Sequence, residues 1–540
     1  MNAHHLLLAA IVALGFALRV WGIGFGLPDI PARPDESALA GVAMEFLQGR
    51  FWPLFFDYPR LMPYLLAVAY AVYGAIAVTA GWFDTFAQFL RTWTQYWPPL
   101  FLLGRWISAV LGVLTLIVIH RLATRTSGRQ AGLIAALFLS VAFLHVRDSH
   151  YATADVPMTF LCWVALAALV RAAEAHDTRA LLAGTCTASL ALSTKYSAVP
   201  AALSVAAVLL VWRTKGWIDT RGLIMSSLKH AALGAAVFLV LNPYVVFDFE
   251  RFRLGMALLS ESYSMGMKTQ HHLGSGWAYH LVVTLRYGVG WPMLAAAAAG
   301  AIVILRRRPA EAAVLGAFVL PYYALAGESR LLFVRYAVPL VPFVSYAAAV
   351  AVDALFTRLG RACPKMLVLA GAAALISIIA VPTLASSVDF DRLLSRRDTR
   401  VVAAEWARAH IPRGATIAQS GSEYGRVGFG FDAPYRNWEY WEAWGTYVDL
   451  HRRRASPRAG LPQYIVVHES PLPYSYVAPR MQQDIKAGYE LVRVIRGLPA
   501  SERRNVYDYQ DAFFMPYAGF YGVSRPGPTI YIWKRRADVQ

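Results

Sequence analysis

Two adjacent carboxylates, Asp35 and Glu36, follow directly after the first apolar segment of the chain. They come after Pro28, Pro31 and Pro34, and a run with helical spacing begins immediately behind them. A carboxylate within hydrogen-bond reach of a hydroxyl or amine can take its proton and so activate it as a nucleophile. The pair also fits a structural role, because Asp35 is a good helix N-cap and Glu36 in the first turn suits the helix dipole. The rest of the sequence has to show whether Asp35 acts as a catalytic base or only as a helix cap.

Three cations, Arg147, Lys195 and Arg335, and a further carboxylate, Asp155, lie beside apolar runs. Ionisable residues near membrane depth are costly unless they are paired or hydrated, and they therefore mark candidate sites. For any single one of them, snorkelling at a helix end is a sufficient explanation. As a group on one face, cations opposed by carboxylates suit an anionic, phosphate-bearing substrate that reacts beside a base.

The composition places these residues in a membrane protein. Of the 540 residues, 57% are hydrophobic and only 16% are charged, and the mean hydropathy is +0.43. A soluble domain would carry about a quarter charged residues. Apolar runs of roughly 18 to 22 residues recur, which predicts a polytopic α-helical membrane protein with about eleven spans. The predicted spans lie near residues 5–25, 101–120, 131–146, 156–171, 180–195, 197–212, 231–248, 278–305, 311–327, 336–356 and 366–385.

The net charge of +18 comes from basic residues in short loops, which is the positive-inside pattern and not a nucleic-acid-binding stripe. These loops fall on alternate connections, so we expect them on the cytoplasmic side of the inner membrane. They contain Arg121, Arg125, Arg129, Arg213, Lys215, Arg221, Lys229, Arg306 to Arg308, Arg358, Arg361 and Lys365. The Asp35–Glu36 loop and everything after residue 386 are then extracytoplasmic. We predict a transmembrane domain over 1–386, whose first external loop is 26–100, and an extracytoplasmic α/β domain over 387–540.

Two segments refine this plan. Tyr64 to Ala80 is apolar enough to span a bilayer, but a span there would move every later arginine-rich loop to the other side, so we predict an interfacial or re-entrant helix. After residue 386 the sequence is rich in Arg, Tyr, Pro and Gly and has no run of span length. A helix and four strands are predicted there: Val401–His410, Ala415–Gln419, Gln463–His468, Glu490–Ile495 and Thr529–Trp533.

A metal site is weakly signalled. Glu261, His271 and His272 lie in segment 249–277, but their spacing is not diagnostic and no third clustered ligand appears, so we expect a substrate-contacting loop and no metal. The cysteines lie in or next to apolar segments and indicate neither a disulfide framework nor a metal site: Cys162, Cys186 and Cys363.

These features together resemble the GT-C membrane glycosyltransferases. The shared elements are a first external loop with Asp-Glu, an amphipathic helix, Tyr58-Pro59 and a second interfacial helix. The nearest group is family 39, the protein O-mannosyltransferases and their bacterial relatives, including the lipid A aminoarabinose transferases. The string His150-Tyr-Ala-Thr-Ala-Asp-Val-Pro-Met158 is similar to the family's second-loop motif, and Arg335-Tyr336 followed by Pro339 and Pro342 resembles a later turn. The tail Asp511-Ala-Phe-Phe-Met-Pro-Tyr-Ala-Gly-Phe520 resembles tails of bacterial members.

The resemblance implies an inverting glycosyltransferase that uses a polyprenyl-phosphate-sugar donor and a lipid, glycan or protein acceptor at the outer membrane face. Asp35 would be the base, Glu36 its neighbour in the acceptor site and Asp155 the second acidic residue of the pocket. Arg335, with Lys195 or Arg147, would hold the lipid phosphate. The other residues expected to contact substrate are Tyr58, His150, Tyr151, His271, His272 and Tyr336.

Two other classes of function stay open. A transporter or flippase for a lipid-linked or anionic solute often has inverted repeats and broken helices near the midplane; no convincing internal repeat is visible, and the candidate charges lie at one face. A sensor or scaffold would leave those charges unexplained. Geometry discriminates between them, because a transferase requires Asp35, Asp155 and Arg335 around one outward-facing cavity.

Overall fold

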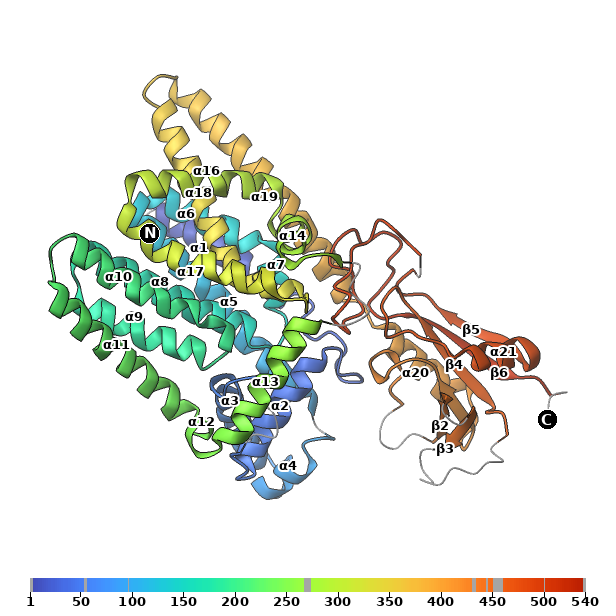
Figure 1. The fold of residues 1–540 in the computed structure, drawn as a ribbon. Coiled ribbons are helices and arrows are strands. Elements are labelled where there is room, and N and C mark those ends of the chain that lie inside the picture. The colour runs from blue at the N-terminus through green and yellow to red at the C-terminus, as the bar shows by residue number, and fades with distance from the viewer. Residues whose placement is uncertain are drawn as a thin grey trace. The chain divides into compact units, whose positions relative to one another are not determined.

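The chain forms two compact units in a computed structural model (Figure 1). Unit 1 comprises Met1–Trp21 and Asp35–Val388, and unit 2 comprises Gly22–Pro34 and Asp389–Gln540. Segment 22–34, most of which the sequence predicts at the start of the first external loop (26–100), therefore belongs with the C-terminal part of the chain. The residues that the structure describes are 3–52, 56–95, 97–266, 273–429, 434–442, 445–449, 460–499 and 501–537.

Unit 1 is a bundle of helices, as its recurring apolar runs require. Neighbouring helices α8, α9, α10 and α11 pack side by side (Figure 1). In chain order the helices are α1 (Ala3–Val20), α2 (Pro34–Leu47), α3 (Leu61–Thr79), α4 (Phe86–Thr92), α5 (Trp97–Ser127), α6 (Arg129–Val141), α7 (Phe143–Asp148), α8 (Asp155–Ala175), α9 (Thr178–Leu192), η1 (Tyr196–Ala198), α10 (Pro200–Thr214), α11 (Thr220–Leu241), α12 (Tyr244–Phe247), α13 (Phe249–Met265), α14 (Gly276–Tyr279), η3 (His280–Leu285), α15 (Arg286–Val289), α16 (Trp291–Arg307), α17 (Pro309–Glu328), η4 (Val334–Leu340), α18 (Val341–Leu359) and α19 (Lys365–Leu394).

Among the described residues, nine helices are long and apolar enough to cross a membrane, or ten if one bent pair counts as a single span. The predicted polytopic helical fold is thus confirmed, with somewhat fewer full-length spans than the predicted eleven or so. Two of the predicted spans are short helices, α6 with 13 residues and α9 with 15. Helix α3 meets the length and apolarity criterion, and its interfacial placement stays a prediction.

One predicted span, 278–305, is not continuous. The arm formed by α14, η3 and α15 meets α16 at an angle of 107°. Gly290 at the junction has φ +85°, a backbone conformation that glycine adopts without steric cost. Pro292 follows in the first turn of α16, where its missing N–H would not be used within the helix. The Gly-Trp-Pro sequence therefore ends one helix and starts the next.

Another boundary also moves. The predicted span over 231–248 is the end of a longer helix, α11, which begins at Thr220. The Asp219 side chain caps this helix by accepting the Gly222 N–H at 2.7 Å. Lys229, which the sequence assigns to a basic loop, consequently lies within the helix.

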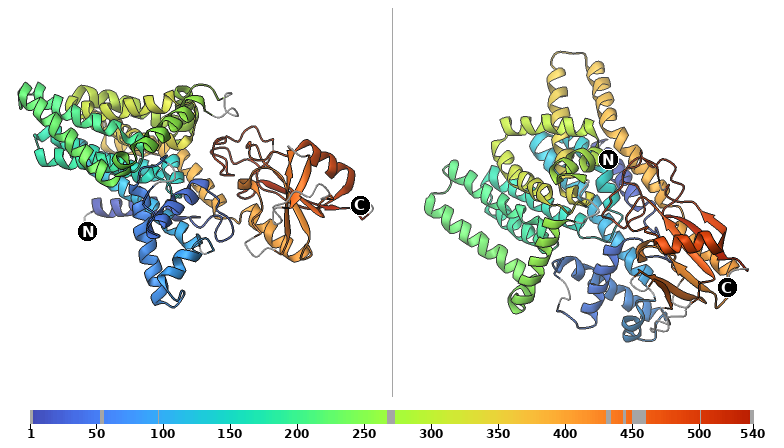
Figure 2. Two further views of the ribbon diagram at one scale, coloured as in Figure 1. Left: turned by 60° about the horizontal axis from the view of Figure 1, so that its bottom comes forward. Right: turned by 45° about the vertical axis from the view of Figure 1, so that its right-hand side comes forward.

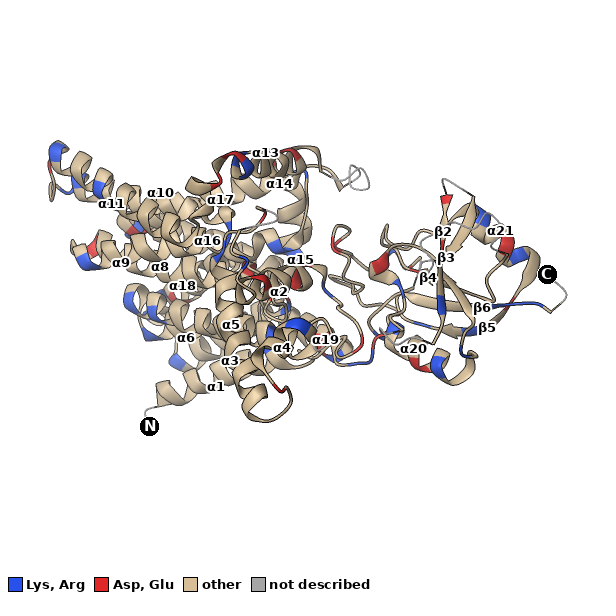
Figure 3. Cartoon of the chain, turned by 90° about the horizontal axis from the view of Figure 1, so that it is seen from below, with Lys and Arg blue, Asp and Glu red and all other residues tan. Residues whose placement is uncertain are grey.

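Charged residues concentrate at helix ends (Figure 3). The buried exceptions in helix bodies have partners. Arg19 of α1 is fully buried and donates to Ser140 O at 3.0 Å and Leu139 O at 3.1 Å. It thereby satisfies carbonyl groups at the carboxyl end of α6, which have no partner within that helix.

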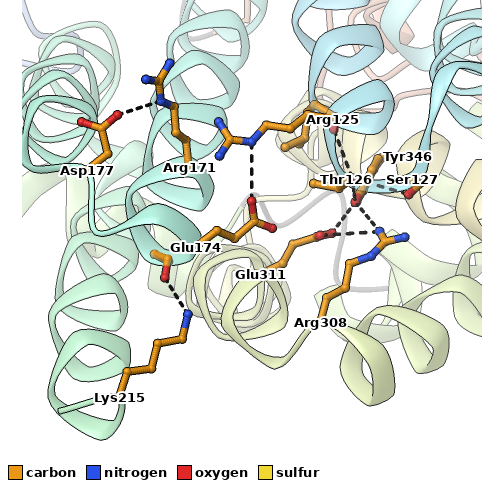
Figure 4. Close-up of polar contacts among 12 residues, drawn as sticks. Arg125, Thr126, Ser127, Arg171, Glu174, Asp177, Lys215, Arg308, Glu311 and Tyr346 are labelled. Carbon is orange, nitrogen blue, oxygen red and sulfur yellow. Dashed lines mark hydrogen bonds and ion pairs between the residues drawn. The ribbon is translucent and has the colours of Figure 1, made fainter. Parts of the chain in front are cut away.

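A polar network joins four helices at the end of the bundle where α5 and α8 finish and α17 begins (Figure 4). Arg125 Nε lies 3.5 Å from Glu174 Oε2. Beside this pair, the Tyr346 hydroxyl bonds to the buried Glu311 carboxylate and lies 2.7 Å from Thr126 Oγ1. Arg125, Lys215 and Arg308, which lie at this end, belong to the loops predicted to be cytoplasmic.

Unit 2 is an α/β domain around a six-stranded sheet of order β3-β2-β1-β4-β6-β5. Strand β1 runs parallel to β2 and β4, and the other pairs are antiparallel. Helices α20 and α21 pack on opposite faces (Figure 2). The predicted helix and four strands are confirmed, whereas β2, β3 and α21 are additional. The elements are α20 (Thr399–His410), β1 (Thr416–Gln419), η5 (Glu423–Gly425), β2 (Arg436–Trp441), β3 (Thr446–Asp449), β4 (Tyr464–Glu469), α21 (Pro479–Gly488), β5 (Tyr489–Ile495) and β6 (Thr529–Arg535).

Candidate active site

A cavity of about 790 Å³ lies in unit 1, within the size range of small-molecule sites. Polar groups occupy part of its wall, and aromatic and aliphatic side chains form the rest. The residues that line it are Asp35, Ala38, Asp57, Tyr58, Lys195, Tyr196, Ser197, Val199, Met256, Leu259, Ser260, Tyr263, Ser264, Tyr322, Leu325, Ala326, Glu328, Ser329, Leu331, Phe333, Arg335 and Tyr336.

Asp35 and Arg335 meet in this cavity. Asp35 is in the first turn of α2, and Arg335 is in η4, the short helix that leads into α18. Arg335 Nη1 lies 2.8 Å from Asp35 Oδ2. The Asp35 side chain is 26% exposed and the Arg335 side chain 7%, so the carboxylate faces the cavity from a pair whose cation is almost buried. Asp35 does not point away from the other candidate charges.

Asp155 and Lys195 complete a four-residue network. Helices α8 and α9 pack against each other as a hairpin, so Asp155 at the start of α8 and Lys195 just after α9 lie at the same end. Lys195 Nζ is 2.6 Å from Asp155 Oδ1, and Arg335 Nε is 4.0 Å from Asp155 Oδ2. Asp155 is 1% exposed and is not among the lining residues. Asp155 thus forms ion pairs with Lys195 and Arg335, and both of these cations line the cavity.

Aromatic residues surround the charges. The Lys195 ammonium lies 5.1 Å from the centre of the Tyr336 ring and the Arg335 guanidinium 4.0 Å from that of Phe333, both within cation–π range. Tyr58, in the loop before α3, also lines the cavity. Burial, and after it the charge of Asp35, raises the pKa of the Tyr58 phenol. Tyr58 therefore remains a neutral hydroxyl that can donate a hydrogen bond.

Glu36 faces away from this cavity. Its carboxylate is fully buried and binds Arg105 of α5 through two bonds, of 2.8 Å from Nε and 2.7 Å from Nη2. It also accepts the Ala152 N–H at 2.9 Å. These contacts join the start of α2 to α5 and to the segment before α8, so Glu36 fixes the backbone next to Asp35.

The other predicted substrate contacts lie elsewhere. Arg147 pairs with Asp148 at 3.1 Å and lies 5.4 Å from the centre of the Tyr151 ring. The His150 ring contacts Val146 O at 3.0 Å and Trp21 O at 3.1 Å. All of these side chains are buried and none lines the cavity. They belong to the segment that leads from α7 into α8.

The predicted contacts His271 and His272 are outside the described residues. Within the described part of the chain, no group of three or more His, Cys, Asp or Glu side chains is arranged to hold a metal ion.

Two lining carboxylates were missed as site residues from the sequence. Asp57 precedes Tyr58 and is exposed at the cavity wall. Glu328 ends α17 and accepts a hydrogen bond from Trp277 Nε1 at 3.2 Å. The position of Asp57 beside Tyr58-Pro59 was the available signal. With Asp35 they give the cavity three carboxylates, only one of which contacts Arg335 in the ion pairs described.

A second cavity, of about 410 Å³, lies between α9, α10 and α11. Its lining is mostly aliphatic, and Val199 lines both cavities. Near its polar part, His230 Nδ1 is 2.9 Å from Thr185 Oγ1. An apolar space between helices α9, α10 and α11 thus adjoins the charged cavity.

The arrangement supports one kind of chemistry directly. A carboxylate in a partly enclosed cavity can accept a proton from a hydroxyl or amine. Two adjacent cations can stabilise the negative charge of a departing phosphate, which needs no general acid. One base and one cationic clamp are sufficient for a single inverting displacement, in contrast to the paired carboxylates of glycoside hydrolases.

The fold is that of the GT-C membrane glycosyltransferases, which confirms the resemblance inferred from sequence at the level of the fold. The family model described as dolichyl-phosphate-mannose-protein mannosyltransferase matches residues 101–247. That segment includes α8, α9 and α10, and with them Asp155 and Lys195. No curated protein sequence matches the chain.

The similar solved structures extend over nearly the whole chain. ArnT from Cupriavidus metallidurans in the apo state is 15% identical with a TM-score of 0.55, and the match covers 98% of this chain and 97% of that one. The same protein bound to undecaprenyl phosphate is 14% identical with a TM-score of 0.52 and the same coverage. The archaeal oligosaccharyltransferase AglB from Archaeoglobus fulgidus, in complex with an inhibitory peptide and a dolichol-phosphate, is 13% identical with a TM-score of 0.53, covering 99% of this chain and 88% of that one.

Proposed function

We propose that this protein is an inverting glycosyltransferase that moves a sugar from a polyprenyl-phosphate carrier to a lipid, glycan or protein acceptor at the outer face of the membrane. The observation that carries the proposal is the meeting of Asp35, Lys195 and Arg335 in one cavity. The fold adds weight, because the similar proteins include one bound to undecaprenyl phosphate and one bound to a dolichol-phosphate.

In the proposed reaction the acceptor oxygen or nitrogen attacks the anomeric carbon of the donor sugar. The bond from that carbon to the phosphate oxygen breaks, and the electron pair leaves with the polyprenyl phosphate. The acceptor proton passes to Asp35. Arg335 and Lys195 take up the charge that develops on the leaving phosphate. Asp155 keeps both cations in place, and Glu36 holds the first turn of α2 through Arg105.

The second cavity suits the hydrocarbon part of such a donor. A polyprenyl chain needs apolar surroundings next to the site that binds its phosphate. The aliphatic space between α9, α10 and α11 adjoins the charged cavity at Val199. We assign the start of the carrier chain to this space and the sugar to the larger cavity, where Asp57 and Tyr58 face it.

The proposal places the cavity and unit 2 on the extracytoplasmic side, from the positions of the basic loops. The test is transfer by the purified full-length protein from defined polyprenyl-phosphate sugars to a mixed acceptor extract, with Asp35→Asn as the control. The expected result is transfer that depends on Asp35, with inversion at the anomeric carbon. Full activity of the Asp35→Asn protein would remove Asp35 as the base. Transfer from no donor would favour a transporter or scaffold.

A further inference from the structure

A single buried amide joins three segments of unit 1. Asn242 follows directly after α11 and is fully buried. Its Oδ1 accepts the Arg60 N–H at 3.0 Å, and its Nδ2 donates to Ser193 Oγ at 3.2 Å and to Phe238 O at 2.9 Å. The Leu61 N–H, next to Arg60, donates to Ser193 O at 2.9 Å. The end of α11, the loop before α3 and the end of α9 therefore meet at this side chain.

The contacts of this amide lie on both sides of Lys195. Ser193, which Asn242 binds directly, is two residues before the lysine. Tyr196 follows the lysine, and its hydroxyl lies 3.0 Å from the Tyr244 hydroxyl. The Tyr244 hydroxyl in turn donates to Asn242 Oδ1 at 3.2 Å, so the proton between the two tyrosines comes from Tyr196. One side chain thus fixes the backbone before Lys195 and the side chain after it.

The connection that carries Lys195 depends on such contacts. Residues 193–195 lie between α9 and η1 and belong to neither, and Lys195 itself has an extended backbone. A lysine side chain is long and flexible, so the place of its ammonium follows from where its backbone is held. The amide of Asn242 uses both Oδ1 and Nδ2 in two hydrogen bonds each. An apolar residue of similar size would remove all four at once.

We propose that Asn242 is a positioning residue for Lys195: by fixing the chain on both sides of that lysine, it determines where the ammonium group lies in the cavity. This inference rests on the proposed function, in which Lys195 binds the donor phosphate. Asp155 holds the ammonium end of the same side chain, and Asn242 holds its backbone end. Asn242 does not line the cavity, so it acts on phosphate binding without contact to the substrate.

The test is titration of the purified full-length protein with undecaprenyl phosphate. Lys195→Met removes the cation and should weaken binding roughly 10- to 100-fold, the range of a hydrogen bond between charged groups. Asn242→Leu should weaken binding about tenfold, because the ammonium is then misplaced but present. In the Lys195→Met protein, adding Asn242→Leu should change binding by less than about twofold, since the two residues act through one contact. A purely structural role would not produce this dependence on Lys195.

Milder variants and a control accompany this cycle. Ser193→Ala and Tyr244→Phe each remove one side of the support, and each should weaken binding about threefold. They carry the same test, with and without Lys195→Met, if the leucine variant does not fold. Thr383 of α19 also joins buried backbone groups, since its hydroxyl accepts the Phe143 N–H at 2.9 Å and donates to Val141 O at 3.1 Å. It does not line the cavity, so Thr383→Val should bind undecaprenyl phosphate like the wild type.

The outcomes separate this inference from the proposed function. If Lys195→Met weakens binding but Asn242→Leu binds like the wild type, the positioning role is overturned and the proposed function stands. The same conclusion follows if Asn242→Leu weakens binding equally with and without Lys195, or if Thr383→Val weakens it as much. If the wild type does not bind undecaprenyl phosphate, or Lys195→Met binds it as tightly as the wild type, the assigned role of Lys195 in the proposed function fails and the positioning role fails with it.

Discussion

Arg335 Nη1 lies 2.8 Å from Asp35 Oδ2, so the proposed phosphate ligand and the proposed base form an ion pair with each other. A donor phosphate would compete with Asp35 for the guanidinium. On binding it would draw Arg335 away and leave the carboxylate available to the acceptor. Through this contact, donor binding would determine whether the Asp35 carboxylate is available to accept the acceptor proton.

The first prediction follows from this competition. Asp35→Asn should lower kcat by roughly 10² to 10⁴, the usual contribution of a general base. The same variant should bind undecaprenyl phosphate about tenfold more tightly, because the guanidinium no longer has to leave a carboxylate, a contact worth about 1.5 to 3 kcal/mol. Binding is measured by titration of the detergent-solubilised protein. Glu328 lines the same cavity, and its described contact is the hydrogen bond from Trp277, so Glu328→Gln should keep wild-type affinity. Weaker binding by Asp35→Asn would contradict the competition.

A second prediction separates Glu36 from its neighbour. Glu36→Gln removes the carboxylate charge that the buried Arg105 binds through two bonds, and it should cost about 3 to 5 kcal/mol of unfolding free energy. The expected readout is a lower thermal midpoint, with donor affinity of the folded protein unchanged. Replacing both residues by methionine should recover much of the loss. Glu250→Gln breaks an exposed pair with Arg253 and should change stability by less than about 1 kcal/mol. A fully stable Glu36→Gln protein without activity would instead favour a chemical role.

The third prediction tests the second cavity. Ala206 lines it from α10, and Ala206→Trp should fill part of the space assigned to the carrier chain. KM should rise several-fold for a long polyprenyl donor and little for a donor with a short chain, since each buried CH₂ contributes about 0.8 kcal/mol. Leu210→Trp, on the same helix but 55% exposed and not in the lining, is the control. An equal rise in KM for both donors would mean that the polyprenyl chain of the donor binds elsewhere.

The fourth prediction concerns pH and unit 2. His468 on β4 is 1% exposed, and burial lowers its pKa to about 4. The unfolded chain, with an ordinary histidine pKa near about 6.5, binds a proton between these values while the folded domain does not. Stability should therefore be complete above about pH 6.5 and fall by roughly 3 kcal/mol as the pH drops to about 4.

The corresponding measurement is hydrogen exchange of peptides from β4 across this pH range. His468→Leu should flatten the pH dependence, even if it lowers stability at every pH because Gly421 and Gly425 pack closely on the ring. A wild-type protein and a His468→Leu variant with the same slope would show that other groups determine it.

The charged part of the site could be predicted from the sequence because charged residues beside apolar runs are costly unless they are paired or hydrated. Such residues are therefore expected to gather in a polar site. Asp155, Lys195 and Arg335 lie at helix ends on one predicted face, and the structure brings them together. Arg147 shares that pattern but forms an ion pair with its neighbour Asp148 and does not line the cavity. The partner of Glu36 was not identified, although Arg105 inside the apolar run 101–120 was a signal that a buried counter-charge must exist.

Other features depend on contacts that leave no local pattern. Membership of segment 22–34 in unit 2 is determined by residues such as Asp511 near the other end of the chain. Strands β2 and β3 carry many polar residues, so alternation alone did not reveal them. The break at Gly290 did leave a local signal, a glycine two residues before a proline. The prediction placed both residues inside one continuous apolar span, 278–305.

Unit 2 is built from two separate segments of the chain, 22–34 and 389–540, and this has a consequence for how the protein folds during synthesis. Residues 22–34 are synthesised before helices α3 to α18, and the tail whose Asp511 pairs with Arg33 is synthesised after them. During translation this segment cannot reach its final core until the tail has been synthesised, which happens after helices α3 to α18. Docking of the segment is then a late, long-range step of the kind that slows folding.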